Sequence, residues 1–151
     1  MKDIRYYDIR HVQGQVTHID IDNTVVESAG TSFFDHAVIR VLGPRGFGII
    51  TLDNYRDTSK KQIGELLEAA LALAIITEEN ANLADTPGKM LPVPPMREDP
   101  RETGIEEKTE ILLDIEKSAR INEIVNTRAN YIEKINTVHF ENSSGQEYNY
   151  E

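Results

Sequence analysis

The sequence predicts an α+β fold: an antiparallel sheet packed by a long helix, then a proline-rich connector, a second helix and a β-meander. Three observations support this prediction. Apolar and polar residues alternate along much of residues 7–51, which is the period of a strand with one buried face. Apolar residues then recur every three or four positions from Ile63 to Ile75, the period of a helix. Five of the six prolines lie between Pro87 and Pro100, where the missing backbone donors exclude a helix or a central strand.

The first part of the chain is expected to be a set of short strands. We expect strands over residues 7–11, 16–22, 24–28, 37–42 and 47–51. Gln13–Gln15 is typical of a turn, and Asp22–Asn23 of a bulge or turn. The glycine-rich segment Gly43–Gly46 joins two apolar runs, which predicts an antiparallel hairpin.

A long helix is expected to follow. It begins at Ser59, because Gln62 three residues later completes a capping box. Its apolar face is wide enough to cover the preceding sheet. The residues of this face are Ile63, Leu66, Leu67, Ala70, Leu71, Ala74 and Ile75.

The proline-rich segment is expected to divide the chain. We predict an N-terminal α+β unit over residues 1–80, a stiff connector over 81–102, and a helix plus β-meander over 103–151. Thr103 and Glu106 form a second capping box, so the second helix is expected from there to about Arg120. The meander is expected as strands 125–131, 135–141 and 146–151, with turns at Glu133–Lys134 and Asn142–Gly145.

The last of these strands ends with the sequence, which predicts a truncated domain with an unpaired sheet edge. We therefore expect self-association through residues 135–151.

Composition excludes several function classes. The formal net charge is −10 and the basic residues are scattered, so we expect no direct binding to nucleic acid. No apolar run approaches the length of a membrane span, and the N-terminus lacks the apolar core of a signal peptide. The absence of cysteine excludes disulfides and thiolate chemistry. A cytoplasmic location is the expectation.

Four features could carry chemistry, and each has a simpler structural interpretation. His18, Asp20 and Asp22 share one face of a strand and could bind a divalent cation, but period-two alternation already explains them as a solvated face. The segment Gly43–Gly48 is glycine-rich, yet an apolar strand follows it where a phosphate loop needs a helix N-terminus.

The other two features are equally weak. His11, His36 and His139 are isolated, and no pair has the i, i+4 spacing of a zinc protease helix. The glutamates of the second helix are typical of a charged solvent face; they are Glu106, Glu107, Glu110 and Glu116. We therefore assign no catalytic, cofactor-binding or metal-ligating residue in this chain.

The order of these pieces resembles the N-terminal domain of the TldD/PmbA family and the start of its middle domain. Each motif is weak by itself, but the order and the alanine-rich helix after the glycine turn make the resemblance more specific. The residues that carry it are 38–43, 46–48, 66–74, 98–100, 105–108, 112–113 and 140–145.

The resemblance implies an intracellular zinc metallopeptidase, also described as a modulator of DNA gyrase, that acts as a dimer around a cavity for peptides. The family's zinc site uses a His-Glu-x-x-x-His helix and a later cysteine, and this chain has neither. The chain is thus expected to be inactive alone and to hold no cofactor, with zinc bound elsewhere in the parent. Its partners would be a second family subunit and, through the parent, a peptide substrate.

Two functions remain open from the sequence. The first is the non-catalytic N-terminal part of a TldD/PmbA-like metallopeptidase subunit, which shapes the substrate cavity and helps subunits to dock. The alternative is a stand-alone protein-interaction module with no peptidase parent. The missing site disfavours a third possibility, a small independent hydrolase.

Overall fold

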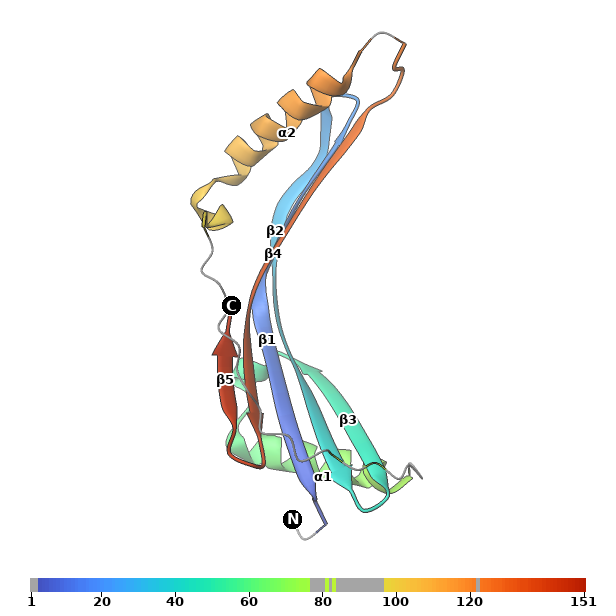
Figure 1. The fold of residues 1–151 in the computed structure, drawn as a ribbon, viewed down its shortest axis with the longest axis vertical. Coiled ribbons are helices and arrows are strands. Elements are labelled where there is room, and N and C mark those ends of the chain that lie inside the picture. The colour runs from blue at the N-terminus through green and yellow to red at the C-terminus, as the bar shows by residue number, and fades with distance from the viewer. Residues whose placement is uncertain (1–2, 77–80, 82, 84–96, 122) are drawn as a thin grey trace. The chain divides into compact units, whose positions relative to one another are not determined.

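The computed structural model describes residues 3–76, 81, 83, 97–121 and 123–151. Five strands form one antiparallel sheet in the order β3-β2-β1-β4-β5 (Figure 1). The elements are β1 (Tyr6–Asp22), β2 (Val25–Gly43), β3 (Gly46–Asp53), η1 (Tyr55–Asp57), α1 (Lys60–Ile76), η2 (Pro100–Glu102), α2 (Ile105–Ala119), β4 (Arg128–Asn142) and β5 (Glu147–Tyr150). The α+β class is confirmed. The strands after the second helix belong to this same sheet and form no separate meander.

The chain divides into two compact units. Unit 1 comprises Met1–Gln13, Phe34–Val93 and Asn136–Glu151, and unit 2 comprises Gly14–Phe33 and Pro94–Ile135. Strands β1, β2 and β4 are long enough to contribute residues to both units. The boundaries predicted at the connector stay a prediction, since most of residues 81–102 lie outside the described residues.

Two predicted turns are wrong, because β1 and β4 continue through segments whose composition is typical of turns. β1 runs without a break through Gln13–Gln15, and β4 runs through Glu133–Lys134. Pairing with neighbouring strands overrides the local turn preference at both places. The turn after Asp22 is confirmed: Asn23 and Thr24 have φ of 50° and 67°, as a tight hairpin requires.

The core of unit 1 lies between one face of the sheet and α1. Fully buried residues of β1 and β2 face the helix, and Leu67 and Ala70 project from α1 toward them. The strand residues are Ile9, Ala37, Ile39 and Val41. Figure 1 shows α1 running across the strands on this covered face.

Local signals in unit 1 behave as the sequence predicts. The capping box is confirmed, because the Ser59 backbone N–H donates to Gln62 Oε1 at 2.9 Å and the Gln62 N–H donates to Ser59 Oγ at 3.3 Å. The hairpin is confirmed as well, with Gly43 opposite Gly46 and Val41 opposite Gly48.

Unit 2 has its own core, in which α2 packs against β1 and β4. Ile19, Ile21 and Leu112 are buried there, with Ala129 and Tyr131 packed around them. The predicted capping box at Thr103 is wrong. Thr103 instead closes the preceding turn, its N–H donating to the Pro100 carbonyl at 3.3 Å, and α2 begins after Gly104 without a side-chain cap.

Over the ranges that the structure describes, no helix is both long enough and apolar enough to cross a membrane.

Candidate functional site

The open face of the sheet in unit 1, opposite α1, carries a hollow of about 540 Å³. Even-numbered residues of β1 and β2 point to this face, whereas the odd-numbered residues point into the core. The face is accessible: Ile49 is 54% exposed. The hollow is lined by Asp8, Arg10, Val38, Arg40, Phe140, Tyr148 and Tyr150.

A charged pair forms one part of this hollow. Arg40 donates from Nε to both oxygens of Asp8, at 3.0 and 3.1 Å, and from Nη2 to Oδ2 at 2.7 Å. The Asp8 side chain is only 3% exposed, whereas that of Arg40 is 46% exposed. The hydrogen bond to Asp8 raises the pKa of Arg40 above its ordinary value. The guanidinium is therefore held in place and reaches solvent on its free side.

Aromatic rings form the other part. Phe140 and Tyr148 stack with their centroids 5.9 Å apart, and Arg10 Nη2 donates to the Tyr150 hydroxyl at 3.5 Å. Two arginines and one carboxylate make the hollow locally positive in a chain of net charge −10. Rings and guanidinium groups side by side suit the carbonyls, carboxylates and apolar side chains of an extended peptide.

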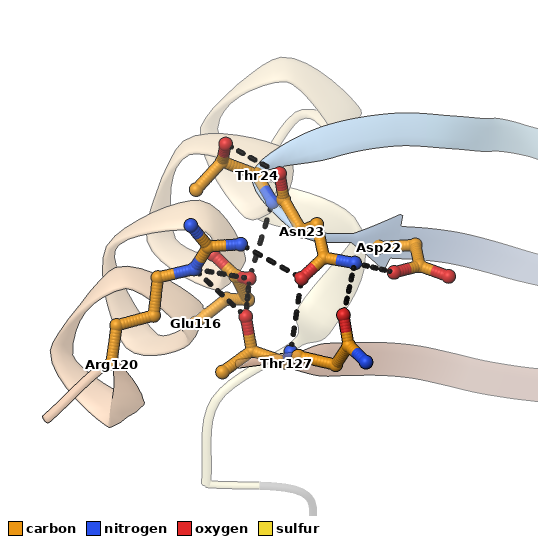
Figure 2. A network of polar contacts seen from close by, with 7 residues as sticks. Asp22, Asn23, Thr24, Glu116, Arg120 and Thr127 are labelled. Carbon is orange, nitrogen blue, oxygen red and sulfur yellow. Dashed lines mark hydrogen bonds and ion pairs between the residues drawn. The ribbon is translucent and has the colours of Figure 1, made fainter. Parts of the chain in front are cut away.

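A polar network fixes the tip of the β1–β2 hairpin in unit 2 (Figure 2). The buried Glu116 carboxylate accepts hydrogen bonds from the Thr24 backbone N–H at 3.1 Å and from the Thr127 hydroxyl. Arg120 donates to Asn23 Oδ1 at 2.9 Å, and its Nε lies 3.4 Å from Glu116. The hydrogen bond from Thr127, with smaller contributions from Thr24 and Arg120, lowers the pKa of Glu116 despite its burial.

This network corrects the expectation that all four glutamates of α2 face solvent. Glu106, Glu107 and Glu110 are exposed, but Glu116 is 2% exposed and points inward. Sequence reasoning missed it, because a helical glutamate i, i+4 from Arg120 is usually a surface residue. Every contact in the network holds the protein together, so we assign it a structural role.

Of the three predicted cation-binding candidates, Asp20 and Asp22 form hydrogen bonds with other residues. Asp20 accepts from Ser28 at 3.1 Å and from Asn130, and Asp22 accepts from Asn23 at 2.7 Å. Across the described residues, no group of three or more His, Asp or Glu side chains could hold a metal ion. The described residues thus do not fit a zinc site, and we derive no chemistry through a metal from them.

The histidines are also separate from one another. His11 lies 2.9 Å from Asp35 and stacks on Tyr55, 4.8 Å between centroids. His139 shares a hydrogen bond of 2.7 Å with Asn149. The glycine-rich segment Gly43–Gly48 is a hairpin that packs on α1, as predicted, and leads into no helix.

A second buried cluster lies between α2 and β4. Lys108 Nζ donates to Glu133 Oε2 at 2.7 Å, and the Tyr131 hydroxyl donates to the same oxygen at 2.5 Å. The two charged side chains are only 9% and 6% exposed. The hydrogen bond to Glu133, burial and the charge of Glu133 raise the pKa of Tyr131 to about 12.

We expect Tyr131 to ionise at higher pH than a free tyrosine, whose pKa is about 10. Because the folded value is the higher one, the stabilisation is complete below about pH 10 and is lost as the pH rises toward the folded value. A titration of tyrosinate absorbance should show a late step that Tyr131→Phe removes. A curve in which Tyr131→Phe leaves this late step unchanged would contradict the assignment.

The comparisons with known proteins agree with this fold. Residues 7–74 match a family model described as PmbA/TldA metallopeptidase domain 1. No curated protein sequence matches the chain significantly. Among solved structures, TldE from Thermococcus kodakarensis is similar with a TM-score of 0.77 and 17% identity over 99% of this chain.

Two further structures share the fold. Both are described as proposed modulators of DNA gyrase. The one from Bacteroides thetaiotaomicron has a TM-score of 0.78 and 10% identity over 98% of this chain, and the one from Thermotoga maritima 0.67 and 13% over 96%. The chain covers 34%, 35% and 33% of the three structures' own lengths, about a third of each.

Proposed function

We propose that the chain is the non-catalytic N-terminal part of a TldD/PmbA-like metallopeptidase subunit, on the ground that residues 7–74 match the model of the first domain of this family. In this role it shapes the cavity that holds the peptide substrate and helps subunits to dock. The parent protein acts in proteolysis in the cytoplasm, with zinc bound by residues outside this chain. Two of the similar structures are described as proposed modulators of DNA gyrase, and the proposal extends this link to the parent.

The open face of unit 1 is the observation that carries the cavity part of this proposal. Its hollow has room for several residues of an extended chain and combines two arginines with three aromatic rings. Such a surface binds main-chain carbonyls and apolar side chains without a reacting group.

The first test is an assay of the chain itself. We expect no hydrolysis of casein or of short peptides, with or without added zinc, because the ligand set for zinc is missing. The intact mass of the natural gene product should also exceed 17.1 kDa. Turnover that follows the concentration of the chain, survives repurification and disappears on chelation would refute the proposal. A natural product of 17.1 kDa would favour the stand-alone interaction module.

The second test uses the parent enzyme. Arg10→Ala and Tyr150→Ala are expected to raise KM for a peptide severalfold and to leave kcat unchanged, because they remove binding shared by the ground and transition states. Lys61→Ala is the matched control, since Lys61 lies on α1 and its side chain is 87% exposed. An unchanged KM in both variants would show that the hollow does not bind the peptide substrate.

A further inference from the structure

The hollow on the open face of unit 1 has unbalanced charges. Of the residues that line it, Arg10 and Arg40 are basic and Asp8 is the one acid. Both oxygens of Asp8 accept hydrogen bonds from Arg40. Arg10 contacts a neutral group instead, the Tyr150 hydroxyl, at 3.5 Å. The lining thus carries one excess positive charge, and a concave surface concentrates the electric field of such a charge.

The Arg40 guanidinium group is held from two sides before any ligand binds. Asp8 on β1 accepts from its Nε and Nη2 atoms. On β3, the ring centroid of Phe47 lies 5.9 Å from the central carbon of the group. The side chain is nevertheless almost half exposed. A planar donor that is already oriented loses little freedom when a ligand binds, and its geometry matches a planar carboxylate.

The charge of the hollow also distinguishes between anions. A carboxylate carries one negative charge, which offsets the one excess positive charge of the lining. A phosphate group carries about two negative charges at neutral pH, and its second charge would be repelled by the buried Asp8 carboxylate. The hollow therefore suits a carboxylate better than a phosphate group.

The apolar part of the hollow suits what lies beside this carboxylate. The rings of Phe140 and Tyr148 stack with an interplanar angle of 19°. Val38 lines the hollow with them. Aromatic rings bind apolar side chains because they bury a large area on contact. A peptide with an apolar residue next to its carboxylate can thus contact both parts of the hollow at once.

We propose that the hollow selects peptides by a carboxylate, which Arg10 and Arg40 bind while a neighbouring apolar side chain packs on the aromatic rings. The carboxylate belongs to an aspartate or glutamate side chain or to the C-terminus of the peptide. Asp8 is a positioning residue, because it acts through Arg40. The inference rests on the proposed function and deepens it, since it names the class of peptide that this wall of the cavity binds.

Binding of matched peptides to the chain tests the proposal. The probes are Ac-Ala-Leu-Glu-Leu-Ala-amide, the same peptide with glutamine in place of glutamate, and the glutamine peptide with a free C-terminal carboxylate. A carboxylate peptide should bind roughly tenfold tighter than the capped glutamine peptide, because hydrogen bonds to a charged group are stronger than neutral ones. Whether the glutamate peptide or the free acid shows this gain identifies the source of the carboxylate.

Substitutions in the hollow should remove this preference. Arg10→Gln and Arg40→Gln are each expected to abolish most of it, with little effect on the capped glutamine peptide. Arg10 is exposed, so its variant should fold normally. Arg40→Lys keeps a cation beside Asp8 but lacks the planar fork, and should retain part of the preference. Lys61→Gln on α1 changes the net charge equally and should leave the preference intact, because Lys61 lies outside the hollow.

The parent enzyme supplies a second readout. The preferred carboxylate peptide should inhibit casein hydrolysis by the parent at a lower concentration than the capped glutamine peptide does. A preference that the isolated chain shows and the parent lacks would mean that another part of the parent covers the hollow. That result would overturn the assignment of the hollow to substrate carboxylates.

Two results with the isolated chain would also overturn the inference. One is equal affinity for all three peptides, and the other is a preference that survives both Arg10→Gln and Arg40→Gln. The proposed function is tested separately. If Arg10→Ala and Tyr150→Ala raise KM in the parent although the three peptides bind equally, the hollow binds substrate without selecting a carboxylate, and only this inference fails.

Discussion

Replacing Gly48 with alanine is expected to lower the free energy of unfolding by about 3 kcal/mol or more, at the upper end of the range for overpacked cores. Gly48 lies on β3 where α1 crosses the sheet. A Cβ built at this position would lie 1.8 Å from the Ala70 carbonyl oxygen and 2.8 Å from the Ala74 nitrogen. Both are backbone atoms of the helix, so the clash can be relieved only if α1 moves away from the sheet.

Gly64 is the matched control for this change. It lies inside α1, and a Cβ built there meets nothing within 4 Å. Gly64→Ala should therefore raise the free energy of unfolding by roughly 0.5–1 kcal/mol, because alanine has the higher helix propensity. Denaturation in urea would compare the two variants with the wild type. Equal midpoints for Gly48→Ala and the wild type would show that the helix is not held this close.

Gly48 also marks the limit of what the sequence predicts about α1. The helix and its capping box follow from spacing alone, because Ser59, Gln62 and the apolar face repeat at helical intervals. The close approach of α1 to the sheet at Gly48 does not follow from the sequence, because a glycine in an apolar strand has several explanations. The buried alanines of α1, Ala70 and Ala74, are the clue in retrospect: small side chains allow a helix to lie close to a sheet.

The strands show where local patterns fail. The sequence predicts short strands, because Gln13–Gln15 and Glu133–Lys134 have the composition of turns. In the structure both lie inside long strands, and Glu133 is 7% exposed. The residues that make this possible are distant in the sequence, such as Lys108, and a single sequence does not reveal such pairs.

The candidate site was missed for the same reason. Asp8 alternates with apolar residues, a pattern that is typical of a solvated strand face, yet it is 2% exposed. Its partner, Arg40, follows 32 residues later in the chain. Only the pairing of β1 with β2 shows that the two side chains meet. Nothing in the local sequence distinguishes Asp8 from the more exposed Asp20 and Asp22.

The Lys108–Glu133 pair should respond strongly to mutation. We expect Lys108→Met to lower the free energy of unfolding by about 3–5 kcal/mol, the range for breaking a buried ion pair. Without the ammonium group, Glu133 would keep only the Tyr131 hydroxyl as a partner. Its Oε1 atom is buried and already has none among the described residues.

The dependence on pH follows from the carboxyl group. Burial raises the pKa of Glu133, but the hydrogen bonds from Lys108 and Tyr131 outweigh it and hold the pKa below its ordinary value. The contribution of the pair is therefore complete above the unfolded pKa, about 4.3, and is lost as the pH falls through the lower folded value. In Lys108→Met, burial would raise this pKa, so the difference from the wild type should shrink as the pH falls.

A double variant distinguishes the loss of the attraction between Lys108 and Glu133 from the cost of leaving the Glu133 carboxylate buried without a cation. Lys108→Met with Glu133→Leu removes both ions and should recover most of the stability, because apolar residues can replace a buried pair. Lys61→Met is the surface control: Lys61 pairs with Glu65 at 3.7 Å with both side chains largely exposed, and its loss should change stability by less than about 1 kcal/mol. If Lys108→Met were as mild as Lys61→Met, Glu133 would have to reach water or another partner in solution. The buried position of Glu133 within β4 would then be wrong, and the turn that the sequence predicts there would regain support.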